Sequence, residues 1–387
     1  MTPVTGSADT RGTGRRRRRV LRWVALGFVL IVLAGGGAAW WLYEKLDGNI
    51  TPDVAAADEL RRYETDRPAL AVLNAQNILL IGSDSRAGTG NARYGRDKGT
   101  QRSDTTILLH LSADRRSATA VSIPRDLMVQ IPACLQSDGG RSVAQFAQFN
   151  WAFEFGGAAC TIRTVENLTG IRVDHHMVVD FQGFKKMVDA VDGVEVCLPQ
   201  AIDDREAKIR LPAGRQTLRG EQALGFVRAR QSLGNGSDTD RMDRQQQFLA
   251  SLVKKVQSSR VLFNPVKLYP VLDAATSAVT TDPGLASLRG LYDLVSGMRE
   301  VPTENVRFLT VPRKPYAFDA NRDELNEPHA TLLFQRLRMD RPFEVVPATG
   351  DQQEGGRNAG EASGDPTSSA SPDPTFTGST ADEAICR

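Results

Sequence analysis

The sequence predicts a layered α-β-α domain around a central mixed sheet, preceded by one transmembrane helix. Short apolar runs that end at glycine or polar turns alternate with stretches of helical periodicity, which is typical of α/β domains. A long uncharged apolar segment lies near the N-terminus. Of the 387 residues, 41% are hydrophobic and 24% are charged, so the chain can bury a sizeable core.

The N-terminal segment carries an unbroken arginine run at 15–19, and residues 23–43 follow without one charged side chain. About 20 apolar residues span the hydrocarbon core of a bilayer. Arginines before the span and Trp40 and Trp41 near its end predict a cytoplasmic N-terminus and an exterior body. A cleaved signal peptide is the alternative, because residues 34–39 are small, but the bulky tryptophans that follow favour a retained anchor.

Composition divides the rest of the chain. The expected segments are a basic cytoplasmic tail (1–22), a transmembrane helix (23–43), a partly helical stalk (44–76), a catalytic domain (77–259), an α/β extension of the same body (260–347) and a disordered tail (348–387). The tail is rich in Gly, Ser, Thr, Pro and acidic residues, and it has too few apolar side chains to offset chain entropy. A net charge of +2 excludes a protein that coats nucleic acid generally.

Within the body, apolar runs and helical periodicity follow one another in order. The expected strands and short apolar runs are 77–82, 105–111, 118–123, 177–181, 194–198 and 306–311. The expected helices are 143–155, 161–168, 183–191, 221–230, 241–256 and 285–295.

Acidic and basic side chains gather at the ends of the first three expected strands. Asp84 follows the first strand, Arg102 and Asp104 open the second, and Arg125 follows the third. Ligands of open α/β sheets bind beyond such strand ends. Two carboxylates with guanidinium groups suit an anionic substrate and a divalent ion, because Mg²⁺ takes one or two carboxylates and completes its shell with water and phosphates. Each motif by itself is more typical of a solvated loop, because Asp and Arg are common loop residues after a strand.

A second cluster lies further along the chain. It comprises Arg228, Arg230, Asp238, Arg241 and Gln245. Arg241 and Gln245 are four residues apart, so one helix face can present both. Guanidinium groups match phosphate oxygens in a bidentate way. A solvated basic helix face is the alternative.

Taken together, these motifs resemble the LytR–CpsA–Psr family of cell-wall glycopolymer ligases, in its actinobacterial form. The segments that carry the resemblance are 77–86, 102–105, 122–126, 150–157, 174–175, 192–196, 220–224, 228–230 and 241–245. They occur in the family's order. Two features depart from the family pattern: the loop between Asp84 and Asp104 is long, and Gln148 stands where the family often has lysine.

The resemblance implies a transferase outside the membrane. It would move a glycopolymer phosphate from a polyprenyl-pyrophosphate carrier to a hydroxyl of peptidoglycan, with the membrane and these two substrates as partners and no nucleic acid. Asp84, Asp104 and Arg125 match catalytic positions, and the two aspartates match the acidic pair near Mg²⁺. The positions that match pyrophosphate or head-group contacts are Arg102, Arg125, Arg228, Arg230, Asp238, Arg241 and Gln245.

Three other functions share these features: a pyrophosphatase that uses water as acceptor, a non-catalytic lipid- or polymer-binding protein, and a membrane-bound transcriptional regulator. The four cysteines are also informative. Cys134 and Cys160 flank an expected helix and can form a disulfide in an oxidising compartment, with free buried thiols as the alternative. Cys197 is expected in the core, and Cys386 in the tail is free or pairs between chains.

Overall fold

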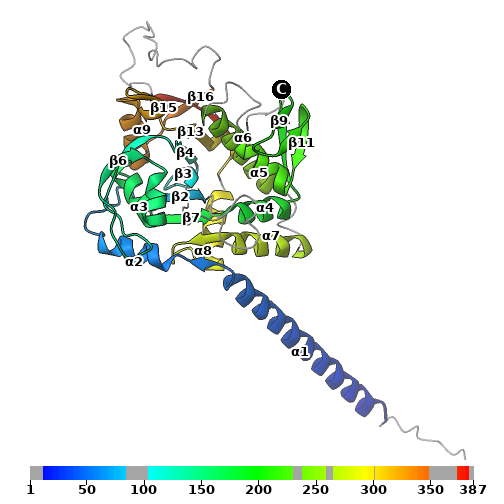
Figure 1. The fold of residues 1–387 in the computed structure, drawn as a ribbon. Coiled ribbons are helices and arrows are strands. Elements are labelled where there is room, and N and C mark those ends of the chain that lie inside the picture. Colours follow the sequence, from blue (N-terminus) through cyan, green and yellow to red (C-terminus); the bar gives the residue numbers. More distant parts are fainter. Residues whose placement is uncertain are drawn as a thin grey trace, which may run out of the picture. The chain divides into compact units, whose positions relative to one another are not determined.

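The computed structural model describes residues 12–83, 103–229, 238–258, 265–299, 301–347 and 373–382. The chain divides into two units, Met1–Gly48 and Asn49–Arg387. The first contains α1 (Gly12–Asp47), and its segment Leu21–Asp47 is the single candidate membrane span among the described residues by length and composition, with a mean hydropathy of 2.0 (Figure 1).

The second unit is built on a mixed sheet. The described strands run in the order β1-β12-β7-β2-β3-β4-β13-β17-β16. Their bounds are β1 Thr51–Pro52, β2 Gln76–Ser83, β3 Ser103–Leu111, β4 Ala118–Ile123, β7 His175–Val179, β12 Val279–Thr281, β13 Val306–Thr310, β16 Glu344–Val346 and β17 Thr375–Thr380. Pairing is antiparallel for β2–β3 and β3–β4 but parallel for β2–β7 and β4–β13, as the predicted mixed sheet requires.

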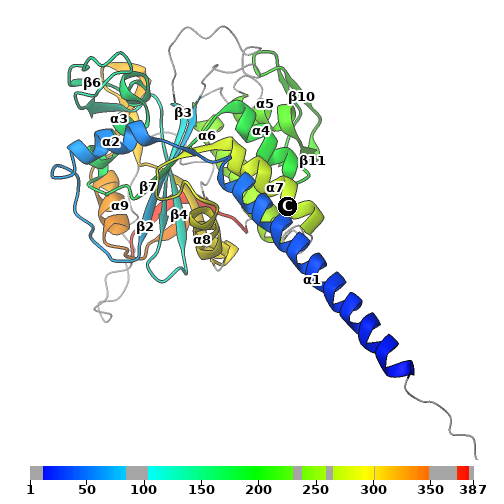
Figure 2. The ribbon, with the colours of Figure 1, turned by 90° about the horizontal axis from the view of Figure 1, so that it is seen from below.

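Helices cover both faces of this sheet, which confirms the predicted α-β-α layers. Side chains alternate along a strand, so Leu79 and Ile81 of β2 pack in one core while Ile78 packs in another. Figure 2 shows α3 and α9 on one side of the strands and α8 on the other. The helices are α2 Val54–Arg62, α3 Trp151–Thr169, α4 Phe181–Ala190, α5 Gly220–Arg228, α6 Asp238–Ser258, α7 Pro265–Ala278, α8 Leu288–Arg299, the 3-10 turn η3 Thr303–Asn305, and α9 His329–Arg338.

Four two-stranded antiparallel sheets occur in the described part of the body besides the central sheet. They are β5 (Met128–Ile131) with β6 (Gln145–Gln148), β8 (Val194–Leu198) with β11 (Gly214–Leu218), β9 (Ile202–Asp204) with β10 (Ile209–Leu211), and β14 (Arg313–Tyr316) with β15 (Asp319–Leu325). The β8–β11 and β9–β10 pairs share a third apolar core with α4 and α5.

The segment expected to be a stalk is packed into the body beyond residue 48. The Asp53 carboxylate caps α2 by accepting a hydrogen bond from the Ala56 N–H at 3.0 Å. After this helix, the Arg67 guanidinium donates to Glu166 of α3, with Nη2 at 2.7 Å from Oε1. Because Glu166 is only 2% exposed, this is a buried ion pair between the segment and α3. The segment is therefore part of the folded domain.

Two further expectations are wrong. The helix expected at 143–155 begins only at Trp151, because residues 145–148 form β6 and pair with β5. Part of the tail that was expected to be disordered forms β17, which pairs with both β13 and β16. Phe376 anchors this strand, since its buried ring packs edge-on against Phe343 with centroids 5.3 Å apart.

Cysteine pairing follows one expectation and corrects another. Cys134 and Cys160 form the predicted disulfide, with Cα atoms 5.6 Å apart. A Cβ atom on Gly156 would lie 2.9 Å from the Cβ of Cys160, so glycine is needed for the helix to pass the disulfide. Cys197 is also disulfide-bonded and is half-buried, which corrects its assignment as a core thiol. Cys386 lies outside the described residues.

Candidate active site

The candidate site lies where four strands of the sheet end. Ser83 closes β2 opposite Ser103 at the start of β3. At the same edge, β4 ends at Ile123. Thr310, the last residue of β13, pairs with Ser122 of β4. The residues beyond these ends therefore meet, although they come from distant parts of the sequence.

Arg125 links two carboxylates at this edge. Its Nη1 donates to Asp104 Oδ1 at 3.2 Å, and its Nε donates to Asp126 Oδ2 at 3.1 Å. The Arg125 side chain is 22% exposed and that of Asp104 is 35% exposed. The predicted pair Asp104 and Arg125 is thus brought together, partly shielded but open to solvent, which is the setting in which a charged ligand can compete for either partner.

Helix α6 places its N-terminal half against the same edge. Arg241 is buried, and its Nη2 donates to the Asp104 backbone oxygen at 3.5 Å. The Gln246 amide donates to Ser122 Oγ at 3.2 Å and to Thr310 Oγ1 at 3.0 Å. These contacts fix the helix across β4 and β13, so Arg241 joins the group formed by Asp104 and Arg125.

The next side chains of α6 hold the end of α5. The Arg244 guanidinium donates to the Ala229 oxygen, and the Gln245 amide donates to the Val227 oxygen at 3.1 Å. Between these carbonyls, Arg228 stacks over the Phe181 ring at 4.6 Å. Gln245 therefore has a local structural partner. Contact of Arg228 or Gln245 with a substrate head group stays a prediction.

Several predicted site residues are not placed. Asp84, Arg102 and Arg230 lie outside the described residues. Asp238 opens α6, but its side chain is not described.

Around Arg125 lie three residues that are not among the predicted site residues, namely Asp126, Gln148 and Asn150. Gln148 donates from its amide to Asp126 Oδ1 at 2.6 Å, so the position where the family often has lysine here holds a neutral donor. The Asn150 N–H donates to the Arg125 oxygen at 3.1 Å. Asn150 Oδ1 is buried and has no hydrogen-bond partner within the described part of the chain. A buried polar atom without a hydrogen-bond partner calls for an explanation. In the sequence, the signal for Asn150 is its place in segment 150–157, which carries the family resemblance.

The described side chains supply one of the two predicted Mg²⁺ ligands. No group of three His, Cys, Asp or Glu that could hold a metal ion occurs in the described ranges. Mg²⁺ bound with a phosphate substrate needs only one or two protein carboxylates. Asp104 fits such a role by its exposure and its place at the sheet edge, and Asp84 would be the second carboxylate.

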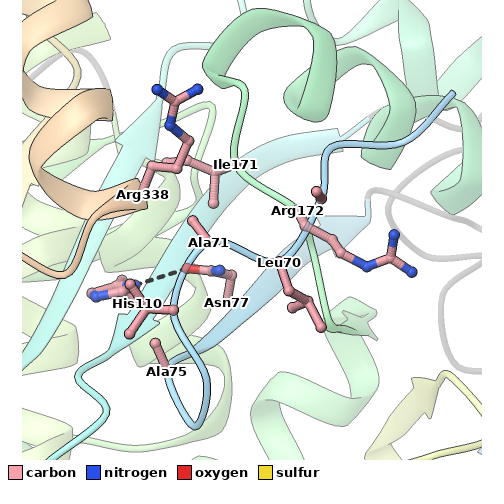
Figure 3. A pocket seen from close by; sticks show the side chains of 10 residues that line it. Leu70, Ala71, Ala75, Asn77, His110, Ile171, Arg172 and Arg338 are labelled. Carbon is pink, nitrogen blue, oxygen red and sulfur yellow. Dashed lines mark hydrogen bonds between the residues drawn. The ribbon is translucent and has the colours of Figure 1, made fainter.

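A small pocket lies at the opposite end of the sheet. Asn77 at the start of β2 and His110 near the end of β3 line it, with Arg172 and Arg338 at its rim. Figure 3 shows the His110–Asn77 hydrogen bond, which is 2.8 Å long, and the two guanidinium groups pointing away from each other. The two guanidinium groups do not converge on one point where an anion could bind, and no carboxylate is among the described residues that line the pocket. The pocket is therefore distinct from the candidate site.

Comparison with known proteins agrees with the resemblance seen in the motifs. The LytR_cpsA_psr family profile matches residues 49–338. The cell wall biosynthesis protein LcpA of Corynebacterium glutamicum is 34% identical over 79% of this chain, and the match spans 62% of LcpA, less than two thirds of its length. The Bacillus subtilis polyisoprenyl-teichoic acid–peptidoglycan teichoic acid transferase TagV is 28% identical over 86% of this chain and 81% of its own length.

Solved structures share the fold. A LytR-Csp2A-Psr enzyme from Actinomyces oris superposes with a TM-score of 0.56 at 20% identity, over 70% of this chain and 93% of its own. TagT bound to LI-WTA gives a TM-score of 0.52 at 22% identity, over 71% of this chain and 96% of its own. The matched range takes in α2 and reaches α9, beyond the expected domain limits of 77 and 259. From residue 49 to residue 338, the chain belongs to the LytR–CpsA–Psr family.

Proposed function

We propose that the protein transfers a glycopolymer phosphate from a polyprenyl-pyrophosphate carrier to a hydroxyl of peptidoglycan, outside the membrane. The observation that carries the proposal is the convergence on Asp104 of Arg125 and Arg241, which come from separate parts of the chain. Carboxylate and guanidinium groups held at one partly shielded point suit phosphoryl transfer, because that reaction depends on positioning and on neutralising charge.

In the proposed reaction, the acceptor oxygen attacks the phosphorus that carries the glycan. The bond from this phosphorus to the bridging oxygen breaks, and polyprenyl phosphate leaves. Asp104 takes the proton of the acceptor hydroxyl, while Arg125 and Arg241 hold phosphate oxygens. When bound, Mg²⁺ would supply further neutralisation of phosphate charge, and Asp104 with Asp84 would hold it. The donor carries its own activated bond, so no nucleotide is needed.

The names of relatives support this substrate class. TagV and TagT of Bacillus subtilis are named as transferases of polyisoprenyl-linked teichoic acid to peptidoglycan. Because the chain spans less than two thirds of LcpA and LcpB, the activity of those whole proteins comes to this chain as a proposal. Which polymer is carried, such as a teichoic acid, an arabinogalactan or a capsule, is a matter for substrate screening.

The test is a transfer assay with the full-length protein in detergent. A polyprenyl-pyrophosphate-linked glycan, labelled in its sugar, is incubated with peptidoglycan, with and without Mg²⁺. The proposal expects label in the insoluble peptidoglycan. Label released as soluble glycan phosphate would identify a pyrophosphatase instead, and donor binding without turnover would identify a binding protein.

Asp104→Asn should abolish the transfer. A matched control is Asp203→Asn on β9, where the aspartate forms an exposed pair with Arg210. Equal loss in both variants would count against a role for Asp104 in the chemistry.

A further inference from the structure

Three aromatic side chains form a row on the surface of the second unit. The Phe146 and Tyr316 ring centroids are 6.1 Å apart, and those of Tyr316 and Phe318 are 5.4 Å apart. Phe146 is 53% exposed and Phe318 is 87% exposed. Aromatic rings that remain in water next to one another leave apolar area unburied, which marks an interaction site. We call Phe146, Tyr316 and Phe318 the aromatic platform.

Two hairpins build the platform from distant parts of the chain. Phe146 lies on β6, whereas Tyr316 ends β14 and Phe318 lies in the turn before β15. An isolated bridge between Leu127 and Asp323 holds the second hairpin beside the first (Figure 1). The row therefore depends on the fold and is not a local cluster of apolar residues.

The platform is continuous with the candidate site. Phe146 and Gln148 are two residues apart on β6 and project from the same face, since Ala147 between them is buried. Gln148 donates to Asp126, which is paired with Arg125. The hairpin reaches the same carboxylate, because Arg322 Nη1 lies 3.8 Å from Asp126 Oδ1. A ligand that contacts Phe146 is thus only two residues along β6 from Gln148, which contacts the side chains around Arg125.

The surroundings favour a polysaccharide over an apolar protein surface. Lys314 and Asn321 are exposed on the hairpin, and Arg322 is 32% exposed. Polar side chains therefore lie on the same hairpin as Tyr316 and Phe318, and Gln148 lies on the side of the site. A pyranose ring presents apolar C–H groups on its face and hydroxyls around its rim, so its face can pack on an aromatic ring while its rim bonds to such polar neighbours.

We propose that the aromatic platform binds the glycan strand of the acceptor and guides its hydroxyl toward Asp104. This inference rests on the proposed transfer reaction and adds to it the surface that holds the acceptor. The occupant is a chain of linked amino sugars. Because the neighbouring ring planes are inclined by 51° and 58°, sugar faces would pack on the exposed rings Phe146 and Phe318 individually.

The test measures KM for soluble peptidoglycan strands in the transfer assay with full-length protein. Phe146→Ala and Phe318→Ala should each raise KM roughly 3- to 10-fold, as expected for loss of one aromatic stacking contact. Phe318→Trp should keep KM near the wild-type value. Phe318→Leu should raise KM as Phe318→Ala does, because leucine is apolar but offers no flat face. Tyr292→Ala on α8 is the matched control and should leave KM unchanged, since Tyr292 is 69% exposed and α8 lies away from β6 and β15 (Figure 1).

The outcomes separate this inference from the proposed function. If the wild-type protein transfers no label, the proposed function fails. If it transfers label and the platform variants keep the wild-type KM, the platform does not bind the acceptor. If Phe318→Leu keeps the wild-type KM as well as Phe318→Trp does, the contact is a general apolar one, such as contact with a second copy of the chain. That result would overturn the proposal.

Discussion

Arg125 is the residue through which the acidic side chains of the candidate site are connected. Two of its three guanidinium nitrogens reach different carboxylates, Nη1 that of Asp104 and Nε that of Asp126. A lysine ammonium is a compact point charge that cannot keep this forked geometry. The identity of the side chain, and not its charge alone, should therefore matter.

The first prediction is that Arg125→Lys lowers turnover roughly 10- to 100-fold, because hydrogen bonds to charged groups contribute about 1.5–3 kcal/mol each. Steady-state transfer rates measure it. Arg215→Lys is the control, since its pair with Glu195 is exposed on both sides and surface substitutions change stability by only about 0.5 kcal/mol. A rate equal to that of the wild type would mean that Arg125 acts as a simple charge.

The second prediction concerns Asp282, which joins β12 to β7. Burial opposes its ionisation, but hydrogen bonds from His175 and from the His176 N–H, with the positive charge of the two histidines, outweigh burial and lower its pKa below the usual 3.8. A lowered pKa stabilises the folded state above the unfolded pKa, and this contribution is lost as the pH falls through the folded pKa. Asp282→Asn should therefore cost about 1–2 kcal/mol at pH 7 and progressively less below about pH 4.

The check for Asp282 is urea denaturation of the full-length protein and the variant in detergent across this pH range. A difference in unfolding free energy that stays constant with pH would show that the charge of Asp282 is not what stabilises the fold.

At this scale, the sequence predicts where charged residues meet better than what each one does. Asp104 and Arg125 lie next to strands that have clear apolar runs. Their proximity at one edge of the sheet can therefore be predicted from the sequence. Gln245 satisfies the α5 carbonyl of Val227, and no sequence signal separates such a role from ligand contact. Asp126 and Asn150 lie in segments that carry the family resemblance, but nothing in the sequence separates their roles from those of ordinary polar loop residues.

At the scale of elements, strands that lack an apolar run cannot be predicted from the local sequence pattern. β17 has only one large buried side chain, Phe376, and obtains its order from pairing with β13 and β16. Pairing between distant segments overrides local propensity. The same holds for β6, where the local pattern around Phe146 and Ala147 predicts a helix but pairing with β5 forms a strand.

The third prediction tests β17. Phe376→Ala should lower the unfolding free energy by about 3 kcal/mol, because it removes a buried aromatic ring and leaves a cavity against Phe343. Thr377→Ala on the same strand is the control, since Thr377 is exposed. Denaturation monitored by near-ultraviolet circular dichroism measures both. Equal midpoints would mean that the strand adds nothing to the stability of the sheet.

The fourth prediction tests the disulfide that closes the loop before α3. Cys134 and Cys160 are 26 positions apart, and in the chain-entropy model a cross-link over such a loop contributes about 3 kcal/mol. The double variant Cys134→Ala/Cys160→Ala should lose that amount in urea denaturation. Peptide mapping without reductant provides the second measurement, and recovery of both cysteines as free thiols in the wild type would contradict the disulfide.

At the scale of the whole molecule, composition placed the domain boundary too late. Residues 49–76 are charged and rich in alanine, which is typical of a linker, but Arg67 pairs with the buried Glu166 and Tyr63 stacks on Arg163 at 3.5 Å. Charged residues that form buried pairs cannot be recognised from composition, because the partner lies about 100 residues away in sequence.

The last prediction is the orientation of the chain in the membrane. The arginine run at 15–19 precedes the apolar helix segment Leu21–Asp47, and basic residues are retained on the cytoplasmic side. A disulfide between Cys134 and Cys160 is stable only in an oxidising compartment. These two independent features lead us to predict that the second unit lies outside the cell.

Alkaline phosphatase fused after Arg387 should be active, and β-galactosidase fused at the same point should be inactive, because each enzyme folds productively on only one side of the membrane. Replacing residues 15–19 by serine should weaken this preference while leaving the helix apolar. Strong β-galactosidase activity of the unaltered fusion would contradict the orientation. It would also remove the proposed function, since a cytoplasmic domain could not reach peptidoglycan.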